Sequence, residues 1–95
     1  MNVIAWKTLD KFIRKHTDAK GQISSWYHKI KAASWSGPQD IKNEYRSADF
    51  LKNNIVIFNI KGNSYRLVVK VSYKSKIVYI KWIGTHAEYE RKSFG

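Results

Sequence analysis

The sequence predicts an α+β fold, in which an N-terminal helical hairpin packs on an antiparallel β-meander and a short helical turn follows the last strand. One observation is the apolar period, which is helical before residues 34–40 and two residues after them. Another is the Gly62-Asn63 pair between two alternating apolar runs, which is typical of a tight β-hairpin. The length of 95 residues predicts a single domain over residues 1–95 with one core.

Two amphipathic helices are predicted before residue 34. Asp18 is the predicted N-cap of the second helix, because a side-chain oxygen there satisfies free N–H groups of the first turn. Facing apolar stripes joined by a short link predict an antiparallel hairpin. The first stripe is Leu9, Phe12, Ile13 and His16, and the second is Ile23, Trp26, Tyr27, Ile30 and Ala33.

The segments that flank the helices show weaker patterns. Met1 to Ile4 are predicted as a short leading strand. Gly37-Pro38 ends the helical part, and Pro38 is suited to open a short helical turn. Residues 44–54 are predicted to form a loop that turns near the sequence SADF.

The central hairpin has a well-defined predicted register. Pairing across Gly62-Asn63 keeps apolar residues on one face along its whole length. The pairs on that face are Val56–Val69, Phe58–Leu67 and Ile60–Tyr65. The other face is predicted to keep Lys61, Arg66, Lys70 and Lys81 near solvent, with Asn59 opposite Arg66.

The sequence allows two registers for the last strand. A two-residue loop at Ser75-Lys76 gives the pairs Val78–Tyr73, Ile80–Val71 and Thr85–Arg66. A three-residue loop would reverse the two faces, because side chains alternate along a strand.

The composition favours a polyanionic partner. Eighteen Lys and Arg against seven Asp and Glu give a net charge of +11, which favours RNA or DNA over an acidic protein or an anionic membrane surface. The chain has no Cys, so disulfides and thiolate metal sites are excluded and a reducing cytoplasm is expected. The N-terminus lacks the apolar core of a signal peptide, and no apolar run approaches the roughly 20 residues of a membrane span.

The sequence Thr85-His86-Ala87-Glu88 matches a capping box, which predicts that Thr85 caps a short C-terminal helix and that Glu88 has a structural role. His86 and Tyr89 then share one side of the first helical turn and emerge near Arg66. A helix N-terminus disfavours an imidazolium, so His86 is expected to be neutral and able to take a proton. The alternatives are a solvated His86 and a Tyr89 that only packs on the domain.

Arg66 is the main candidate for phosphate binding, because it lies mid-hairpin beside Asn59 and Lys61 and clustered donors hold phosphates. A solvated basic face is the alternative. No ligand spacing predicts a metal, and no P-loop, G-x-G-x-x-G or G-x-S-x-G motif is present. The expected chemistry is therefore acid–base work on a phosphate without metal or cofactor. Further residues expected to bind nucleic acid are Lys70, Lys74, Lys76, Lys81, Arg91 and Lys92.

Two motifs, FNIKGNSYRL and IGTHAEY, together with the weaker DAKGQISSWYHKIKAASW and SADFL, resemble the HigB group of bacterial toxins within the RelE-like superfamily. The resemblance covers about residues 18–90. It implies two helices on a curved antiparallel sheet, and a ribosome-dependent mRNA endonuclease in the cytoplasm. It also implies a cognate HigA-type antitoxin, through which alone operator DNA is bound, and no membrane partner.

The resemblance also implies roles for individual residues. Arg66 matches a position implicated in binding the scissile phosphate, and Lys61 and Tyr89 match regions that carry active-site residues. His86 belongs to the HigB-type motif. In the expected reaction the RNA 2′-OH attacks the adjacent phosphorus, with His86 as acid or base and Arg66 and Lys61 as stabilising cations. Tyr89 would stack on a base or assist proton transfer. A non-catalytic RNA- or DNA-binding module and a basic domain for an acidic protein are the alternatives.

Overall fold

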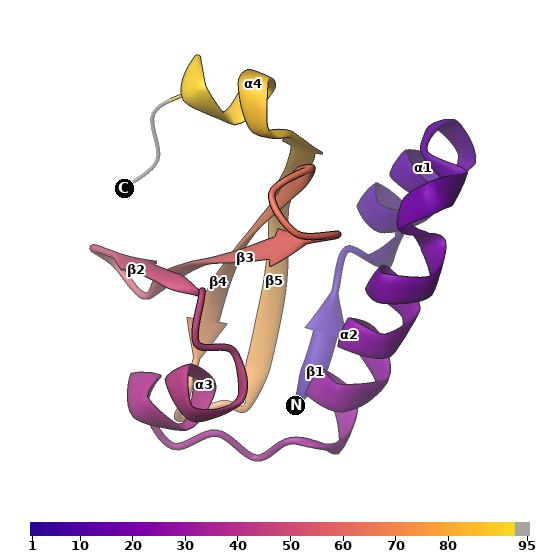
Figure 1. Cartoon of the computed structure of the whole chain (residues 1–95). Coiled ribbons are helices and arrows are strands. Elements are labelled where there is room, and N and C mark those ends of the chain that lie inside the picture. The colour runs from indigo at the N-terminus through magenta and orange to yellow at the C-terminus, as the bar shows by residue number, and fades with distance from the viewer. Residues whose placement is uncertain (93–95) are drawn as a thin grey trace.

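The computed structural model describes residues 1–92, and its centre is a five-stranded sheet with strand order β1-β5-β4-β3-β2 (Figure 1). Strands β2 to β5 form an antiparallel meander, and β1 lies parallel to β5. The α+β class is therefore confirmed, whereas the prediction of a wholly antiparallel sheet is wrong. The strands are β1 (Asn2–Ile4), β2 (Asp49–Leu51), β3 (Ile55–Ile60), β4 (Tyr65–Ser72) and β5 (Ile77–Thr85).

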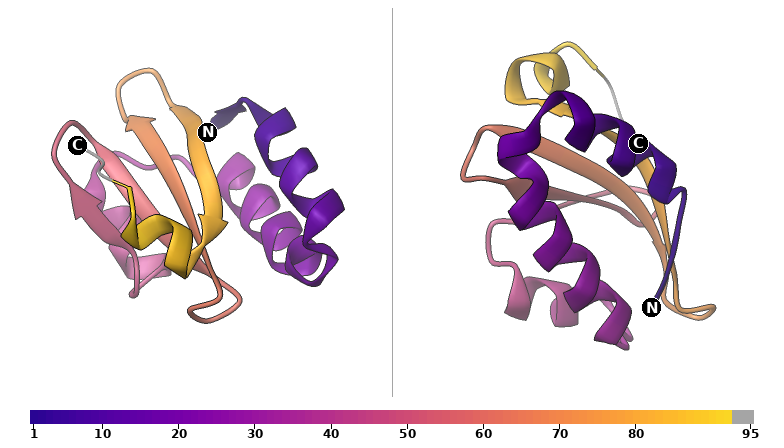
Figure 2. Two further views of the ribbon diagram at one scale, coloured as in Figure 1. Left: turned by 90° about the horizontal axis from the view of Figure 1, so that it is seen from above. Right: turned by 90° about the vertical axis from the view of Figure 1, so that its right-hand side faces the viewer.

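The helices form where the sequence predicts them, and α1 and α2 lie on the same side of the sheet (Figure 2). A 3₁₀ turn joins these two helices, and each contacts the sheet, α1 at β5 and α2 at β1. The predicted hairpin of two facing helices is not confirmed. None of the helices in residues 1–92 is long and apolar enough to cross a membrane. The elements are α1 (Trp6–Lys15), η1 (Thr17–Ala19), α2 (Lys20–Ala32), α3 (Pro38–Glu44) and α4 (His86–Glu90).

The predicted leading strand is confirmed as β1. The N-terminal ammonium of Met1 donates hydrogen bonds to the backbone carbonyls of Ile30 and Ala33, at 3.1 and 2.6 Å. These bonds tie the start of the chain to the end of α2. They hold β1 in place at the edge of the sheet, beside the first half of β5.

The two faces of the sheet carry two separate apolar clusters. The face toward the first three helices holds the main core, whose largest fully buried side chains include Trp26, Phe58, Leu9, Ile23, Ile30 and Ile41. On the other face a smaller cluster of Ile55, Ile57 and Val68 is covered by Trp82 and Tyr89. The second face is therefore only partly exposed to solvent, because Tyr89 of α4 packs on part of it.

The hairpin register across Gly62-Asn63 is confirmed at every predicted pair. Lys61 and Gly62 adopt left-handed φ values of 53° and 62°, and the Ser64 N–H donates to the Lys61 carbonyl at 3.1 Å. Glycine adopts this backbone conformation without steric cost, which explains the turn.

The predicted register of β5 is wrong by two residues near the turn and by one residue beyond the bulge, where Thr85 pairs with Tyr65 and not with Arg66. Val71 pairs with Val78, because residues 73–76 form a longer turn in which Lys76 has a φ of 58°. A β-bulge then follows, so that Val69 faces Ile80 while its neighbour Val68 faces Trp82. The bulge carries one extra residue on β5, and that residue redirects the side chains beyond it.

Two local predictions are corrected. The structure assigns Ala19, not Asp18, as the N-cap of α2, because η1 precedes the helix. The predicted loop at residues 44–54 contains the end of α3 and the edge strand β2. Strand β2 has three residues, which are too few to show an alternating pattern in the sequence. The turn after β2 has Asn53 and Asn54 at positive φ, a conformation that Asn tolerates.

Candidate active site

Arg66 is the centre of the candidate site. It lies on β4, on the face opposite the main core, and its side chain is 16% exposed. Nη1 donates to Asp49 Oδ2 at 3.1 Å, and Nη2 lies 3.2 Å from His86 Nε2. The guanidinium carbon sits 4.7 Å from the centre of the Tyr89 ring, within cation–π range. The predicted proximity of His86 and Tyr89 to Arg66 is therefore confirmed.

Helix α4 presents His86 and Tyr89 because its start is fixed at two points. Thr85 and Glu88 form the predicted capping box: Glu88 N–H donates to Thr85 Oγ1 at 3.1 Å, and Thr85 N–H donates to Glu88 Oε1 at 2.8 Å. The hydrogen bond from the Thr85 backbone lowers the pKa of Glu88. The His86 N–H also donates to the Ser64 carbonyl at 3.2 Å, so α4 is attached to the central hairpin.

The geometry assigns a tautomer to His86. A guanidinium has only donors, so the 3.2 Å contact with Arg66 makes Nε2 the acceptor and leaves the proton on Nδ1. Nδ1 lies 3.6 Å from Glu90 Oε1, which favours that proton position. In this arrangement the Nε2 lone pair points at Arg66.

Trp82 belongs to the site although the sequence did not single it out. Its ring centre lies 6.3 Å from that of Tyr89, and both rings cover the cluster of Ile55, Ile57 and Val68. The bulge on β5 pairs Trp82 with Val68 and so directs it to this face. A bulge leaves no local pattern in the sequence, so this placement had no signal.

Asp49 was also missed. It lies on β2, the edge strand beside β3, and it fixes one end of the Arg66 guanidinium. The SADFL motif contains Asp49 and was the available signal, but the segment had been predicted as a loop. The carboxylate side chain is 58% exposed, so an anion from solvent has access to exchange with it.

Lys61 lies apart from this group. Its ammonium pairs with Asp18 Oδ2 at 2.8 Å, and the Tyr65 hydroxyl donates to both oxygens of that carboxylate. Tyr65 and Arg66 are neighbours on a strand, so their side chains leave opposite faces. The hydrogen bond between Lys61 and Asp18 lowers the pKa of the Asp18 carboxyl and raises that of Lys61.

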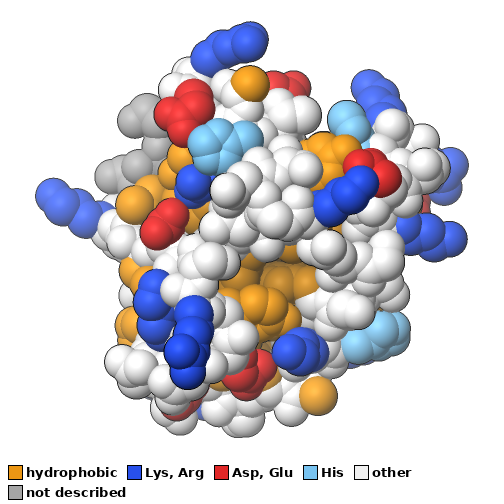
Figure 3. Space-filling model, viewed as in Figure 1, with side chains coloured by type: hydrophobic (Ala, Val, Ile, Leu, Met, Phe, Trp, Pro, Cys, Tyr) orange, Lys and Arg blue, Asp and Glu red, His pale blue; other side chains and the backbone are white. Residues whose placement is uncertain are grey.

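The other predicted nucleic-acid residues do not form one patch. Lys74 and Lys76 lie in the β4–β5 turn, at the opposite end of the sheet from α4 (Figure 1), and Lys76 donates to the Trp35 carbonyl at 2.8 Å. Arg91 and Lys92 follow α4, and the Lys92 ammonium lies 5.6 Å from the Trp82 ring centre. Basic side chains are scattered over the face shown in Figure 3, with acidic ones between them. The exposed residues of the predicted set are Lys70, Lys74, Lys81, Arg91 and Lys92.

The site residues were also considered as metal ligands. Within residues 1–92, no three His, Asp or Glu side chains come close enough together to hold a metal ion. The donor set around Arg66 is instead one guanidinium, one imidazole and two aromatic rings, with Asp49 alongside. Such a set can bind a phosphate, move one proton and contact a base.

Comparison with known proteins supports the resemblance. A family model of HigB toxins, described as the RelE-like toxic component of a toxin–antitoxin system, matches residues 19–92. The chain is 25% identical over 93 residues to an mRNA interferase HigB of Escherichia coli O6:H1, covering 96% of this chain and 90% of the relative. It is 28% identical over 92 residues to an mRNA interferase HigB of Shigella flexneri, covering 95% and 88%. The family match spans most of the chain, and the chain therefore belongs to the HigB family of RelE-like toxins of toxin–antitoxin systems.

Proposed function

We propose that this chain is a ribosome-dependent, metal-independent endoribonuclease, which cleaves mRNA and so inhibits translation as the toxin of a type II system. The observation that carries the proposal is the partly exposed Arg66 guanidinium, which is held between Asp49, His86 and Tyr89. The names of the relatives, mRNA interferases, support mRNA as the substrate.

The reaction begins when a 2′-hydroxyl oxygen of the RNA attacks the adjacent phosphorus. A new O–P bond forms and the bond to the 5′-oxygen breaks, which leaves a 2′,3′-cyclic phosphate and a 5′-hydroxyl. The 2′-OH loses a proton to a base, the leaving oxygen gains one from an acid, and negative charge grows on the other phosphate oxygens. Arg66 stabilises that charge, since a guanidinium donates two parallel hydrogen bonds to an oxyanion.

His86 is the proposed base. Its Nε2 lone pair points at Arg66 in the absence of substrate. When phosphate oxygens accept the hydrogen bonds of the guanidinium, that lone pair becomes available for the 2′-OH proton. Tyr89 is placed to stack on a base or to assist the transfer.

Lys61 is proposed to stabilise the phosphate charge as a cation outside this cluster. It precedes β4 in the turn and is exposed, but it has to exchange Asp18 for a substrate phosphate. Its contribution is therefore expected to be smaller than that of Arg66.

The proposed dependence on the ribosome follows from how little acid–base chemistry the cluster offers. Among residues 1–92, His86 is the one imidazole that contacts Arg66, and a single base leaves protonation of the departing oxygen to another group. A ribosome that holds the message in an in-line geometry supplies orientation, which is worth several orders of magnitude in rate. The same proposal places the enzyme in the cytoplasm, with a HigA-type antitoxin as its partner and operator DNA reached only through that antitoxin.

The decisive test compares one message in two states. Purified protein is expected to leave the naked RNA largely intact and to cut it when it is translated in a reconstituted system, with the cuts mapped by primer extension. Rapid cutting of the naked RNA would contradict ribosome dependence. Binding to ribosomes without any cut would favour the non-catalytic RNA-binding alternative.

Metal independence needs a separate test, because ribosomes themselves require Mg²⁺. A message with a phosphorothioate at the mapped scissile position is cleaved on ribosomes in Mg²⁺ and then with added Mn²⁺. Sulfur binds Mn²⁺ better than Mg²⁺, so a catalytic metal would show a rate loss that Mn²⁺ restores. The proposal predicts no Mn²⁺ rescue, and a clear rescue would contradict it.

A further inference from the structure

The large apolar side chains that are exposed within residues 1–92 all lie in one row across the sheet. They are Ile4, Leu51 and Tyr79, with exposed fractions of 39%, 36% and 39%. In strand order this cross-sheet row is Ile4, Tyr79, Lys70, Ile55 and Leu51, and each residue pairs with the next. Paired residues share one face of a sheet, and apolar side chains gathered on an exposed face mark an interaction surface.

The cross-sheet row lies on the same face as the candidate active site. Its member Ile55 belongs to the small cluster that Trp82 and Tyr89 cover. Lys70 follows Arg66 by four residues on β4, so both side chains leave the same face of the strand. Four residues of a strand span about 13 Å. An RNA strand held at Arg66 can therefore reach the row within a few nucleotides.

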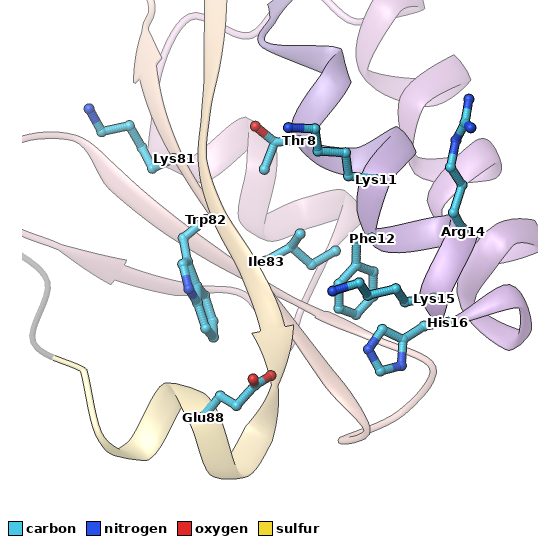
Figure 4. Close-up of a pocket in the computed structure, with 10 residues that line it drawn as sticks. All are labelled: Thr8, Lys11, Phe12, Arg14, Lys15, His16, Lys81, Trp82, Ile83 and Glu88. Carbon is cyan, nitrogen blue, oxygen red and sulfur yellow. The ribbon is translucent and has the colours of Figure 1, made fainter.

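The β-bulge adds a second lysine to this face. Figure 4 shows Lys81 and Trp82 on one side of β5 and Ile83 on the other side, toward Phe12 of α1. Lys70 and Lys81 are both exposed, and within residues 1–92 neither forms an ion pair. Two uncompensated cations on an open face attract a polyanion.

Tyr79 offers an aromatic ring beside both lysines. It pairs with Lys70 across the strands and precedes Lys81 by two residues on β5. None of the ring contacts within residues 1–92 involves Tyr79, so its ring is open to a stacking partner. Single-stranded RNA binds to proteins through bases that stack on aromatic side chains and phosphates that contact cations.

A protein partner fits the cross-sheet row less well. The row is one side chain wide and Lys70 interrupts it, whereas a standard protein interface takes roughly 20–30 residues from each partner. A second copy that met this face through a two-fold axis would bring the lysines of both copies close together, and like charges in an interface are costly. The continuity with Arg66 favours the same RNA that the nuclease site holds.

We propose that Tyr79 is the stacking platform of a second message-binding subsite, in which Lys70 and Lys81 hold the flanking phosphates. The inference rests on the nuclease function proposed above and says where the message lies beyond the scissile bond. Ile4 and Leu51 provide apolar contacts at the two ends of the row. The subsite strengthens binding of the message and touches no reacting atom.

The first test measures binding to a fluorescein-labelled, twelve-nucleotide 2′-O-methyl RNA of mixed sequence, which has no free 2′-OH and is not cleaved. Tyr79→Ala should weaken binding about tenfold by fluorescence anisotropy, whereas Tyr79→Phe keeps the ring and should bind within about twofold of the wild-type chain. Equal affinities of the wild-type chain and Tyr79→Ala would overturn the proposal.

The lysines have a matched control. Lys70→Ala should weaken binding and lower the salt slope of the affinity by about one. Lys20→Ala makes the same charge change at an exposed residue of α2, on the other side of the sheet, and should leave both quantities nearly unchanged. Equal effects of the two variants would reduce the lysine contribution to net charge and contradict the subsite.

Programmed ribosomes decide whether the stacked base comes from the message. Single abasic nucleotides are placed within six positions of the mapped cut, wherever no tRNA pairs with the message. One abasic position should raise the half-saturating concentration for single-turnover cleavage about tenfold in the wild-type chain, with a smaller change in maximal rate. The same position should have little effect in Tyr79→Ala, because the ring is already absent. Weaker ribosome binding by Tyr79→Ala without coupling to any message position would assign the row to ribosomal RNA and overturn the proposal.

The remaining outcomes separate the subsite from other readings. A dimer in analytical ultracentrifugation that Tyr79→Ala dissociates would make the row an interface between copies and overturn the proposal. Should the wild-type chain fail to cleave on ribosomes, the nuclease function falls, whereas the 2′-O-methyl RNA still shows whether Tyr79 and its lysines bind RNA.

Discussion

Arg66 shows how much a single side chain can be understood from sequence. Its place mid-hairpin and the capping box after β5 were enough to predict that His86 and Tyr89 lie beside it, which the structure confirms. The ion pair with Asp49 could not be predicted, because it depends on β2 being a strand rather than a loop. The roles of these residues in catalysis stay predictions.

Glu88 tests whether the capping box is structural. Glu88→Gln keeps an acceptor for the Thr85 N–H, so cleavage should change little and stability should fall by less than that of Glu88→Ala. The Ala variant should lose roughly 1 kcal/mol, the usual value of a helix cap. Urea denaturation followed by circular dichroism measures the stabilities. A large loss of cleavage by a fully stable Gln variant would instead place Glu88 in the catalytic set.

Asp18 gives a pH prediction. Hydrogen bonds from Lys61 and Tyr65 hold the pKa of its carboxyl below the usual value of 3.8. A lowered folded-state pKa means that the stabilisation is complete above the unfolded pKa and is lost as the pH falls through the folded one. The melting temperature of the wild-type chain should therefore fall below about pH 4 more steeply than that of Asp18→Asn. Parallel curves for the two proteins would show that the Asp18 contacts contribute nothing.

At the scale of elements, long and regular segments were predictable and short or distant pairings were not. The central hairpin has a turn signal and a matching period on both strands, so its register followed from local sequence. The parallel pairing of β1 with β5 joins residues from the two ends of the chain, and no local pattern contains it. The bulge on β5 likewise leaves no local pattern in the sequence, yet it directs Trp82 to the site.

Gly84 tests the link between the bulge and α4. A Cβ on Gly84 would lie 2.5 Å from Trp82 Cζ2 and 2.9 Å from Glu88 Oε1, so Gly84→Ala forces both side chains to move. We expect a loss of about 1–3 kcal/mol, typical of overpacking, together with weaker cleavage. Chemical denaturation and a cleavage assay measure the two effects.

The matched control is Gly21→Ala on α2, where an added Cβ meets no atom within 4 Å. A helix interior favours Ala over Gly by roughly 0.5–1 kcal/mol, so this variant should be unchanged or slightly more stable. Should Gly84→Ala behave like Gly21→Ala, the packing of Trp82 against Gly84 would not matter for the position of α4.

At the scale of the whole molecule, the positive charge is widely distributed whereas the candidate active site is confined to one place. The net charge of +11 is spread over several parts of the surface, and it favours encounter with a polyanion such as the ribosome. The candidate chemistry gathers around Arg66 of β4, whose guanidinium contacts Asp49 of β2 on one side and His86 of α4 on the other. Composition alone predicted the class of partner, while the location of the site needed the motif and the fold.

Single-turnover cleavage on programmed ribosomes by the wild-type chain, Arg66→Ala and Arg66→Lys tests the central claim most directly. Both variants should stay folded by circular dichroism and lose on the order of 100-fold or more in rate, because a Lys ammonium does not reproduce the two-pronged grip on a phosphate. Lys74→Ala, in the distant β4–β5 turn, is the control and should keep most of the cleavage rate. Its effect should appear in binding and in the salt dependence of that binding. A folded Arg66→Ala variant that cleaves at the wild-type rate would contradict the phosphate role of Arg66 and the nuclease site built around it.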